Sequence, residues 1–246
     1  MSRTEGVLVL AMVLAPVGLA FVLVATFVLI VAAWQAAHGM PFTLPTRADL
    51  QSFGLLSYVA VSWADVVVVW LWSSRRGLRG EVFAFRGLTL PALTAAIAGF
   101  VIAMYGAPPV TQWLSHVSGG QGPSAIDFHD ARSIAIYVLL FMVTAPVCEE
   151  ILYRGLLVGW LRRVGWRDPT IWLVGSLIFG LNHAIPLGLV WATVMVMFGA
   201  ILFALRLRTD SLTPAWLTHF LFNAQPLVIY PLLAWLAPGW LPGRLA

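Results

Sequence analysis

The sequence contains no lysine, a single cysteine and few charged residues, and these shortages exclude several classes of protein. Only 10% of its 246 residues are charged, whereas 61% are hydrophobic. Soluble globular domains have about 25% charged and about 45–50% apolar residues. The lone Cys148 excludes an internal disulfide and a cysteine-based zinc cluster, and we interpret it as a small buried core residue. The composition therefore predicts an integral membrane protein.

All 14 basic residues are arginines, and the net charge is +4. Most of these arginines lie in short connections between long apolar runs. This arrangement is typical of membrane topology and not of a nucleic-acid-binding surface. We therefore expect the lipid bilayer as a partner and no nucleic acid.

The apolar runs predict an all-α fold, a polytopic membrane protein with about eight transmembrane helices in a single integral-membrane domain, residues 1–246. The first run, residues 7–34, is about 28 residues long, far longer than the ~7–15 apolar residues of a signal peptide. We therefore expect it to be retained as the first span. The other spans are expected at about 54–72, 91–105, 133–161, 168–186 and 187–205, with the last two in 211–236.

The longest loop is expected at residues 106–132, which are rich in glycine, proline, serine and aspartate. His116, His129 and Asp130 lie in it, and we interpret them as solvated residues rather than as a surface metal site. Asp65 lies in the second predicted span, where a lone carboxylate is a candidate functional residue. A carboxylate hydrogen-bonded to a neighbouring helix would explain Asp65 equally well.

The arginines also predict the orientation of the chain in the membrane. Eight spans place the connections 73–90, 162–168 and 206–210 on the same side as both termini. These three connections hold nine arginines, and the opposite connections hold about two. Because arginine-rich connections mark the cytoplasmic side, we expect both termini in the cytoplasm and the protein in the plasma (inner) membrane.

Two adjacent carboxylates, Glu149 and Glu150, stand in an otherwise apolar run of the fourth predicted span. Ionisable groups at membrane depth are costly and seldom occur without a partner or a function. Arg154 lies four residues after Glu150, on the same helix face, so these two are expected to pair and to support the helix. Glu149 is rotated by about 100° and needs a partner from elsewhere. Pro146 removes a helical hydrogen bond and predicts a bend just before the acids.

Three polar side chains from other spans are expected at the depth of Glu149. A rise of ~1.5 Å per residue puts four residues about 16–22 Å from the cytoplasmic ends of their spans: Glu149, His183, His219 and Asn223. The hydrocarbon core is about 30 Å thick, so they lie near its middle. The fourth, fifth and seventh spans are therefore expected to bring them together, with Phe179 packed beside His183 one helical turn away.

These residue types suit the hydrolysis of a peptide bond. A carboxylate near an imidazole can activate water, while a second histidine and an asparagine amide can stabilise an oxyanion. Glu149, His183 and His219 would also satisfy a zinc ion with one open position, although no HExxH motif is present. The expected cofactor is therefore either none or Zn²⁺. A serine mechanism fits less well, because nothing in the sequence marks Ser176 as activated.

Three ordered motifs in the second half of the chain resemble those of the CPBP family. This family includes type II CAAX prenyl endopeptidases and bacteriocin-processing or immunity proteins, the so-called Abi proteins. EEILYR matches EExxxR, FGLNH matches FxxxH and HFLFN matches HxxxN, all within residues 133–236. The resemblance implies that 133–236 is a CPBP-like catalytic core.

The resemblance also implies a role for each matched residue. Glu149 would be the catalytic glutamate and would activate water together with His183. The oxyanion would be stabilised by His219 and Asn223, while Glu150 and Arg154 would support the helix. The family is often described as metalloproteases, yet we favour a metal-free mechanism, because an asparagine amide is a better oxyanion donor than zinc ligand.

The sequence thus predicts an intramembrane endopeptidase whose substrate is a membrane-associated or prenylated CAAX-type protein, or a peptide precursor. One alternative is a non-catalytic membrane protein that serves bacteriocin immunity or scaffolding. Another is a proton-coupled transporter that uses Asp65, Glu149 and the histidines as a relay. No inverted repeat in the sequence supports the transporter.

Overall fold

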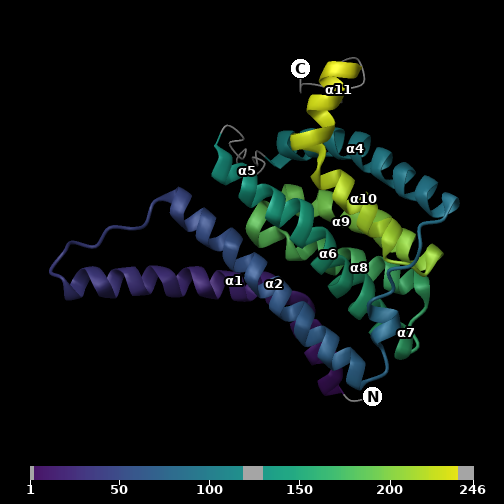
Figure 1. Cartoon of the computed structure of the whole chain (residues 1–246), viewed down its shortest axis with the longest axis horizontal. Helices are drawn as coiled ribbons and strands as arrows, with labels where there is room; N and C mark the ends of the chain where they lie inside the picture. The colour runs from purple at the N-terminus through teal and green to yellow at the C-terminus, as the bar shows by residue number, and fades with distance from the viewer. Residues whose placement is uncertain (1–2, 119–129, 238–246) are drawn as a thin grey trace.

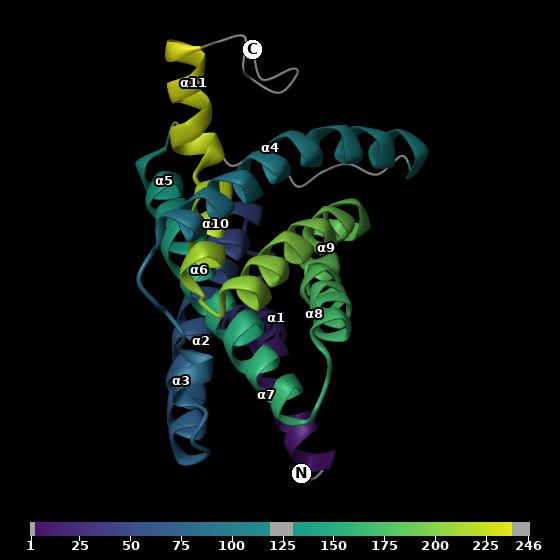
Figure 2. The same ribbon diagram turned by 90° about the vertical axis from the view of Figure 1, so that its right-hand side faces the viewer.

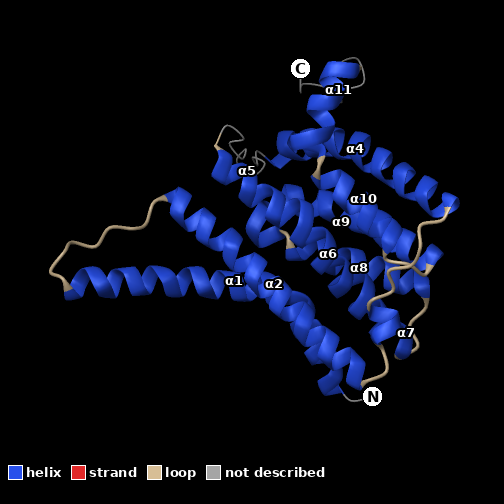
Figure 3. Ribbon diagram, in the orientation of Figure 1, coloured by secondary structure: helices blue, strands red, loops and turns tan. Residues whose placement is uncertain are grey.

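The computed structural model describes residues 3–118 and 130–237, and this part of the chain contains helices but no strand (Figures 1 and 3). The predicted all-α fold is therefore confirmed. The helices in chain order are α1 (Arg3–Ala37), α2 (Arg47–Arg75), α3 (Arg79–Val82), α4 (Leu90–Ser118), α5 (Ala131–Tyr137), η1 (Val138–Thr144), α6 (Ala145–Glu149), η2 (Glu150–Leu157), α7 (Val158–Arg163), α8 (Asp168–Asn182), α9 (Ala184–Thr209), α10 (Thr213–Asn223), η3 (Gln225–Ile229) and α11 (Tyr230–Leu236).

Within the described residues, five helical segments are long and apolar enough to cross a membrane: Thr4–Ala37, Arg47–Arg75, Leu90–Ser118, Ala131–Arg163 and Ala184–Thr209. The predicted fifth and seventh spans are the helices α8, of 15 residues, and α10, of 11 residues. At ~1.5 Å per residue, neither reaches across a hydrocarbon core of about 30 Å. The membrane class is thus supported, but the count of eight spans is not confirmed.

The predicted seventh and eighth spans form one bent path instead of a hairpin. At its start, Thr213 donates a hydrogen bond from Oγ1 to the backbone oxygen of Arg86. At the end of α10, Asn223 donates from Nδ2 to the backbone oxygen of Phe141, in η1. Beyond it, α11 leads further away from α3 and does not turn back (Figures 1 and 2). Proline at 226 and 231 bends this path without reversing it.

The third span is longer than predicted, because α4 continues to Ser118. Gly106, Pro108 and Pro109 suggested a loop, but the helix passes through both prolines. Ala107 and Val110 pack against the core on either side of the prolines, whereas Trp113 and Val117, further along the helix, are exposed.

The predicted long loop is therefore shorter than expected. His116 lies on α4, and Asp130 accepts a hydrogen bond from the backbone N–H of Ser133 as the N-cap of α5. His129 lies outside the described residues.

The three arginine-rich connections meet at one end of the bundle, as their shared side predicted. Arg162 pairs with Glu81, Asp168 and Asp210, at 3.4, 3.2 and 2.6 Å. The buried Arg206 binds Glu81 at 2.9 Å. These ion pairs tie α3 to the ends of α7 and α9. The hydrogen bond from Arg162 holds the pKa of Asp210, which follows α9, below its ordinary value.

Close helix packing places the segments that carry the predicted site. The run from α5 to α7 lies between α1 and α2 on one side and α8, α9 and α10 on the other (Figures 1 and 2). Gly155, in η2, lies against the backbone oxygen of Val82, where an added Cβ would approach to 2.1 Å. Gly180, in α8, lies against Val196 of α9, where a Cβ would come within 2.5 Å of the backbone nitrogen. Only glycine allows these two approaches.

Candidate active site

The helix that carries the two acids changes its hydrogen bonding around them. Pro146, in α6, has no N–H to donate, and π-helical segments precede and follow α6. π-helical turns are uncommon and occur often at functional sites. The bend predicted at Pro146 stays a prediction, and what the structure shows there is π-helical hydrogen bonding on both sides of α6. In this setting Glu149 and Glu150 both face the imidazole of His219.

Glu150 and Arg154 form the predicted pair. Arg154 Nη1 lies 3.3 Å from Glu150 Oε1, and both side chains are fully buried. The guanidinium also stacks on Phe179 and Phe203, with its carbon 4.1 and 4.5 Å from the ring centroids. Such cation–π contacts stabilise a cation that has lost its water. The charge of Arg154 is thus compensated by one carboxylate and two aromatic faces.

His219, on α10, bridges the two carboxylates. Its Nδ1 lies 2.9 Å from Glu150 Oε1, and its Nε2 lies 3.9 Å from Glu149 Oε2. Because an ionised carboxylate only accepts hydrogen bonds, we assign the Nδ1 proton as the one donated to Glu150. Phe198 packs edge-on against the imidazole, with ring centroids 5.4 Å apart. The ring is therefore fixed with Nε2 directed at Glu149.

Glu149 has a partner that the sequence did not reveal. Tyr58, on α2, donates a hydrogen bond from its hydroxyl to Glu149 Oε1 at 2.8 Å. The only signal in the sequence is a polar face of α2, since Ser62 and Asp65 follow Tyr58 at helical spacing and are buried. Among the described residues, Asp65 makes no ion pair, and its Oδ2 has no hydrogen-bond partner. The two explanations of Asp65 therefore stay open.

His183 lies beside Phe179, as predicted, but not against Glu149. Its Nδ1 donates to the backbone oxygen of Phe179 at 2.7 Å, and the two rings are 4.8 Å apart. In the described part of the chain, no hydrogen bond or ion pair joins His183 to Glu149. The reason is its position as the C-cap of α8, at the turn into α9, where its Nδ1 satisfies a free carbonyl of the helix end. The imidazole that meets Glu149 is that of His219.

Asn223 is the last residue of α10, one helical turn after His219. Its amide donates one hydrogen to the backbone oxygen of Phe141 at 2.8 Å, and its backbone oxygen accepts from the Tyr137 hydroxyl. Its second amide hydrogen makes no hydrogen bond within the described chain. Ser176, one turn before Phe179, donates to the backbone oxygen of Trp172 at 2.6 Å, which fits a helix-packing serine.

The possible zinc ligands Glu149, His183 and His219 do not gather around a common point. Over residues 3–118 and 130–237, no group of three histidine, cysteine or acidic side chains is placed to hold a metal ion. Cys148 is buried next to Glu149 and unpaired. As arranged, these side chains do not fit a zinc site.

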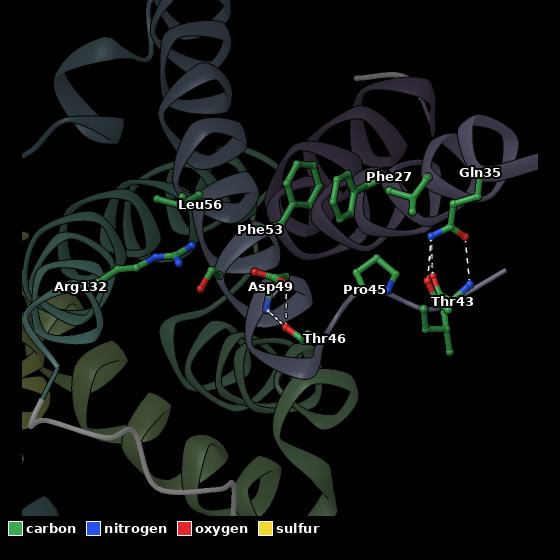
Figure 4. Close-up of a pocket in the computed structure, with 12 residues that line it drawn as sticks. Phe27, Gln35, Thr43, Pro45, Thr46, Asp49, Phe53, Leu56 and Arg132 are labelled. Atoms are coloured by element: carbon green, nitrogen blue, oxygen red, sulfur yellow. Dashed lines mark hydrogen bonds between the residues drawn. The ribbon is translucent and has the colours of Figure 1, made fainter. Parts of the chain in front are cut away.

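A cavity of about 480 Å³ lies apart from these residues, between α1, α2 and α5 (Figure 4). Phe27 and Phe53 stack on one wall, 4.5 Å apart, and Arg132 reaches in from the start of α5. Gln35 bonds Thr43 at the other end. None of the residues that line this cavity belongs to the predicted site.

Comparison with known proteins identifies the segment that carries the three motifs. A family model described as Rce1-like, type II CAAX prenyl endopeptidase Rce1-like, matches residues 131–225. This match begins at the first residue of α5 and includes every predicted site residue, whereas Tyr58 lies outside it. Comparisons with curated proteins and with solved structures gave no match. The match supports the resemblance carried by the three motifs: residues 131–225 are similar to the CAAX protease family that this model describes.

Proposed function

We propose that this protein is an intramembrane endopeptidase that uses Glu149 as a general base. The observation that supports it is the distance of 3.9 Å between Glu149 Oε2 and His219 Nε2. This is too long for a direct hydrogen bond, but one water about 2.8 Å from each atom can donate to both. Both hydrogens of such a water are held by acceptors, so a lone pair of its oxygen is left to attack a peptide carbonyl.

Glu150 orients the histidine in this arrangement. Glu150 accepts a hydrogen bond from the protonated Nδ1 of His219 at 2.9 Å, which leaves Nε2 unprotonated and able to accept a hydrogen bond from the water. The same carboxylate compensates Arg154, so its predicted structural role is joined to a role in positioning His219. Hydrolysis would proceed by transfer of a water proton to Glu149 as the oxygen bonds to the carbonyl carbon. That proton would then pass to the leaving amine.

We assign the stabilisation of the oxyanion to the amide of Asn223, whose second hydrogen makes no hydrogen bond within the described chain. The roles expected for the two histidines change accordingly. His219 accepts a hydrogen bond from the attacking water instead of stabilising the oxyanion. Nδ1 of His183 is bonded to the backbone oxygen of Phe179, and its Nε2 has no hydrogen-bond partner among the described residues. We assign this nitrogen to the side from which the substrate approaches.

The substrate is proposed to be a membrane-associated protein or peptide precursor, with a prenylated CAAX-type tail as one form of it. We propose residues 133–236 as the catalytic core and the plasma membrane as the location. The arginine-rich end formed by α3 and the ends of α7 and α9 is assigned to the cytoplasm, together with the start of α1, where Glu5 pairs with Arg76. Because α11 leads away from that end (Figures 1 and 2), we propose that the end of α11 lies toward the opposite side of the membrane. The C-terminus, which was expected in the cytoplasm, lies outside the described residues.

Peptide cleavage in proteoliposomes tests the proposal, with prenylated and unprenylated peptides offered and the products identified by mass spectrometry. Glu149→Gln is expected to lower the rate by about 10²–10⁴-fold, the contribution of a general base. The matched control is Asp168→Asn, which changes a carboxylate at the arginine-rich end of the bundle, outside the proposed site, and should leave the rate unchanged. The wild-type activity should also survive chelation.

Three results would contradict the proposal. A wild-type protein that cleaves none of the peptides points to the non-catalytic alternative. Wild-type rates in Glu149→Gln exclude Glu149 as the base. Stoichiometric zinc that is lost together with activity excludes a metal-free mechanism.

A further inference from the structure

We infer that Tyr58 is a positioning residue for Glu149, and that α2 thereby completes the site from outside the segment matched by the family model. Its hydroxyl holds Oε1 at 2.8 Å and so turns Oε2 toward His219 Nε2. The inference rests on the proposed function for its effect on rate. Its effect on the carboxylate itself does not depend on that function.

The two carboxylate oxygens of Glu149 face different partners: Oε1 faces Tyr58, and Oε2 faces His219. Without Tyr58, Glu149 has no hydrogen-bond donor within the described chain, and its side chain is free to rotate so that either oxygen faces His219. A bond to Oε1 fixes the carboxylate plane, and the remaining oxygen lies at the place assigned to the water. Catalytic groups must be held within about 0.5 Å of their working geometry. Tyr58 supplies that restraint.

Two hydrogen bonds fix the register between α2 and the helix that carries Glu149. Besides the bond from Tyr58 to Glu149, Trp63 Nε1 donates to Thr144 Oγ1 at 3.1 Å. The donors are five residues apart on α2, and the acceptors are five residues apart in the opposite sense. Two such bonds between antiparallel helices fix their relative sliding, so the hydroxyl of Tyr58 is delivered to Glu149 by the packing of the fold.

The hydrogen bond between Tyr58 and Glu149 lies in a buried environment. Glu149 is only 6% exposed, and Ser62 and Asp65 show that the same face of α2 is turned inward. Hydrogen bonds to a charged group are about twice as strong as those between neutral groups, and they gain further where water is excluded. The Tyr58 hydroxyl is therefore placed where its loss has the largest effect on the carboxylate.

The test compares Tyr58→Phe, which removes only the hydroxyl, with Trp63→Phe, which removes the other bond from α2 to this helix. The first readout is the infrared band of the Glu149 carboxylate, isolated by subtracting the spectrum of Glu149→Gln in each background. Tyr58→Phe should shift this band, and Trp63→Phe should not. The second readout is cleavage, where Tyr58→Phe should lower kcat about 10- to 100-fold and leave KM unchanged.

The outcomes separate this inference from the proposed function. An unshifted Glu149 band in Tyr58→Phe overturns the inference, whether or not the protein cleaves peptides. A shifted band with wild-type kcat also overturns it, because the hydroxyl would then hold the carboxylate without serving the reaction. If the wild type cleaves nothing, the proposed function fails, and the band alone decides whether Tyr58 positions Glu149. Equal band shifts in both variants would mean a general loosening of α2, and they count against the inference.

Discussion

The removal of Glu150 is expected to destabilise the protein through the charge that it leaves behind on Arg154. Both side chains are fully buried, and Nη1 is the only guanidinium nitrogen of Arg154 that has a hydrogen-bond partner in the described chain. Loss of one member of a buried ion pair costs about 3–5 kcal/mol, since the other charge stays buried without compensation. The aromatic faces of Phe179 and Phe203 offset part of this cost, by roughly 1–2 kcal/mol. Glu150→Ala should therefore lose about 1–4 kcal/mol.

A double variant separates this effect from the role of Glu150 toward His219. Replacement of a buried ion pair by apolar residues of similar size is often neutral for stability. We therefore expect Glu150→Leu with Arg154→Met to recover most of the stability lost in Glu150→Ala. Cleavage should not recover, because His219 Nδ1 has lost its acceptor in both variants.

Reversible unfolding in mixed micelles measures these free energies, and the peptide assay measures cleavage. The matched control is Asp168→Ala, which removes a partly exposed partner of Arg162 and should cost no more than about 1 kcal/mol. A Glu150→Ala protein as stable as the control would refute the reasoning about Arg154. A double variant that cleaves normally would refute the positioning of His219 by Glu150.

Two further predictions concern the parts of the fold that support the site. Arg162 lowers the pKa of Asp210, so the folded state binds this proton less tightly than the unfolded chain. The contribution of Asp210 to stability is then present above the ordinary value of 3.8 and is lost as the pH falls through the lower folded value. The stability gap between wild type and Asp210→Asn, measured by unfolding at each pH, should close in that range; a gap that widens would contradict the prediction. Gly180→Ala should force α8 away from Val196 and lower both stability and cleavage, whereas Gly87→Ala, where a Cβ meets nothing, should not. Unchanged unfolding in Gly180→Ala would show that the close approach is not needed.

The sequence by itself determined whatever depends on one helix or on composition. Low charge and long apolar runs predicted a helical membrane protein, which the five long helices support. A spacing of four residues predicted the pair of Glu150 with Arg154 and the contact of Phe179 with His183, and both are present. These predictions succeed because neighbours on one helix face are fixed by the helix repeat, whatever surrounds the helix.

The path of the chain between helices was less predictable. Gly106 and the prolines after it suggest a loop, but α4 stays helical through them to Ser118. Likewise, Pro226 and Pro231 suggested the end of one span and the start of another, whereas α10 and α11 follow one bent course. Proline weakens a helix locally, and the energy of tertiary packing decides whether the helix continues.

Only the tertiary structure decided which partners Glu149 meets. Estimates of depth placed both histidines at its level, but depth says nothing about the direction in which a side chain points around its helix. Packing of α10 brings His219 to the acids from 69 residues away, while His183 is held at the end of α8. Packing of α2 adds Tyr58, 91 residues from Glu149 in the sequence. Contacts of this kind depend on how helices are rotated and slid against one another, and this is set by the shapes of all the side chains between them.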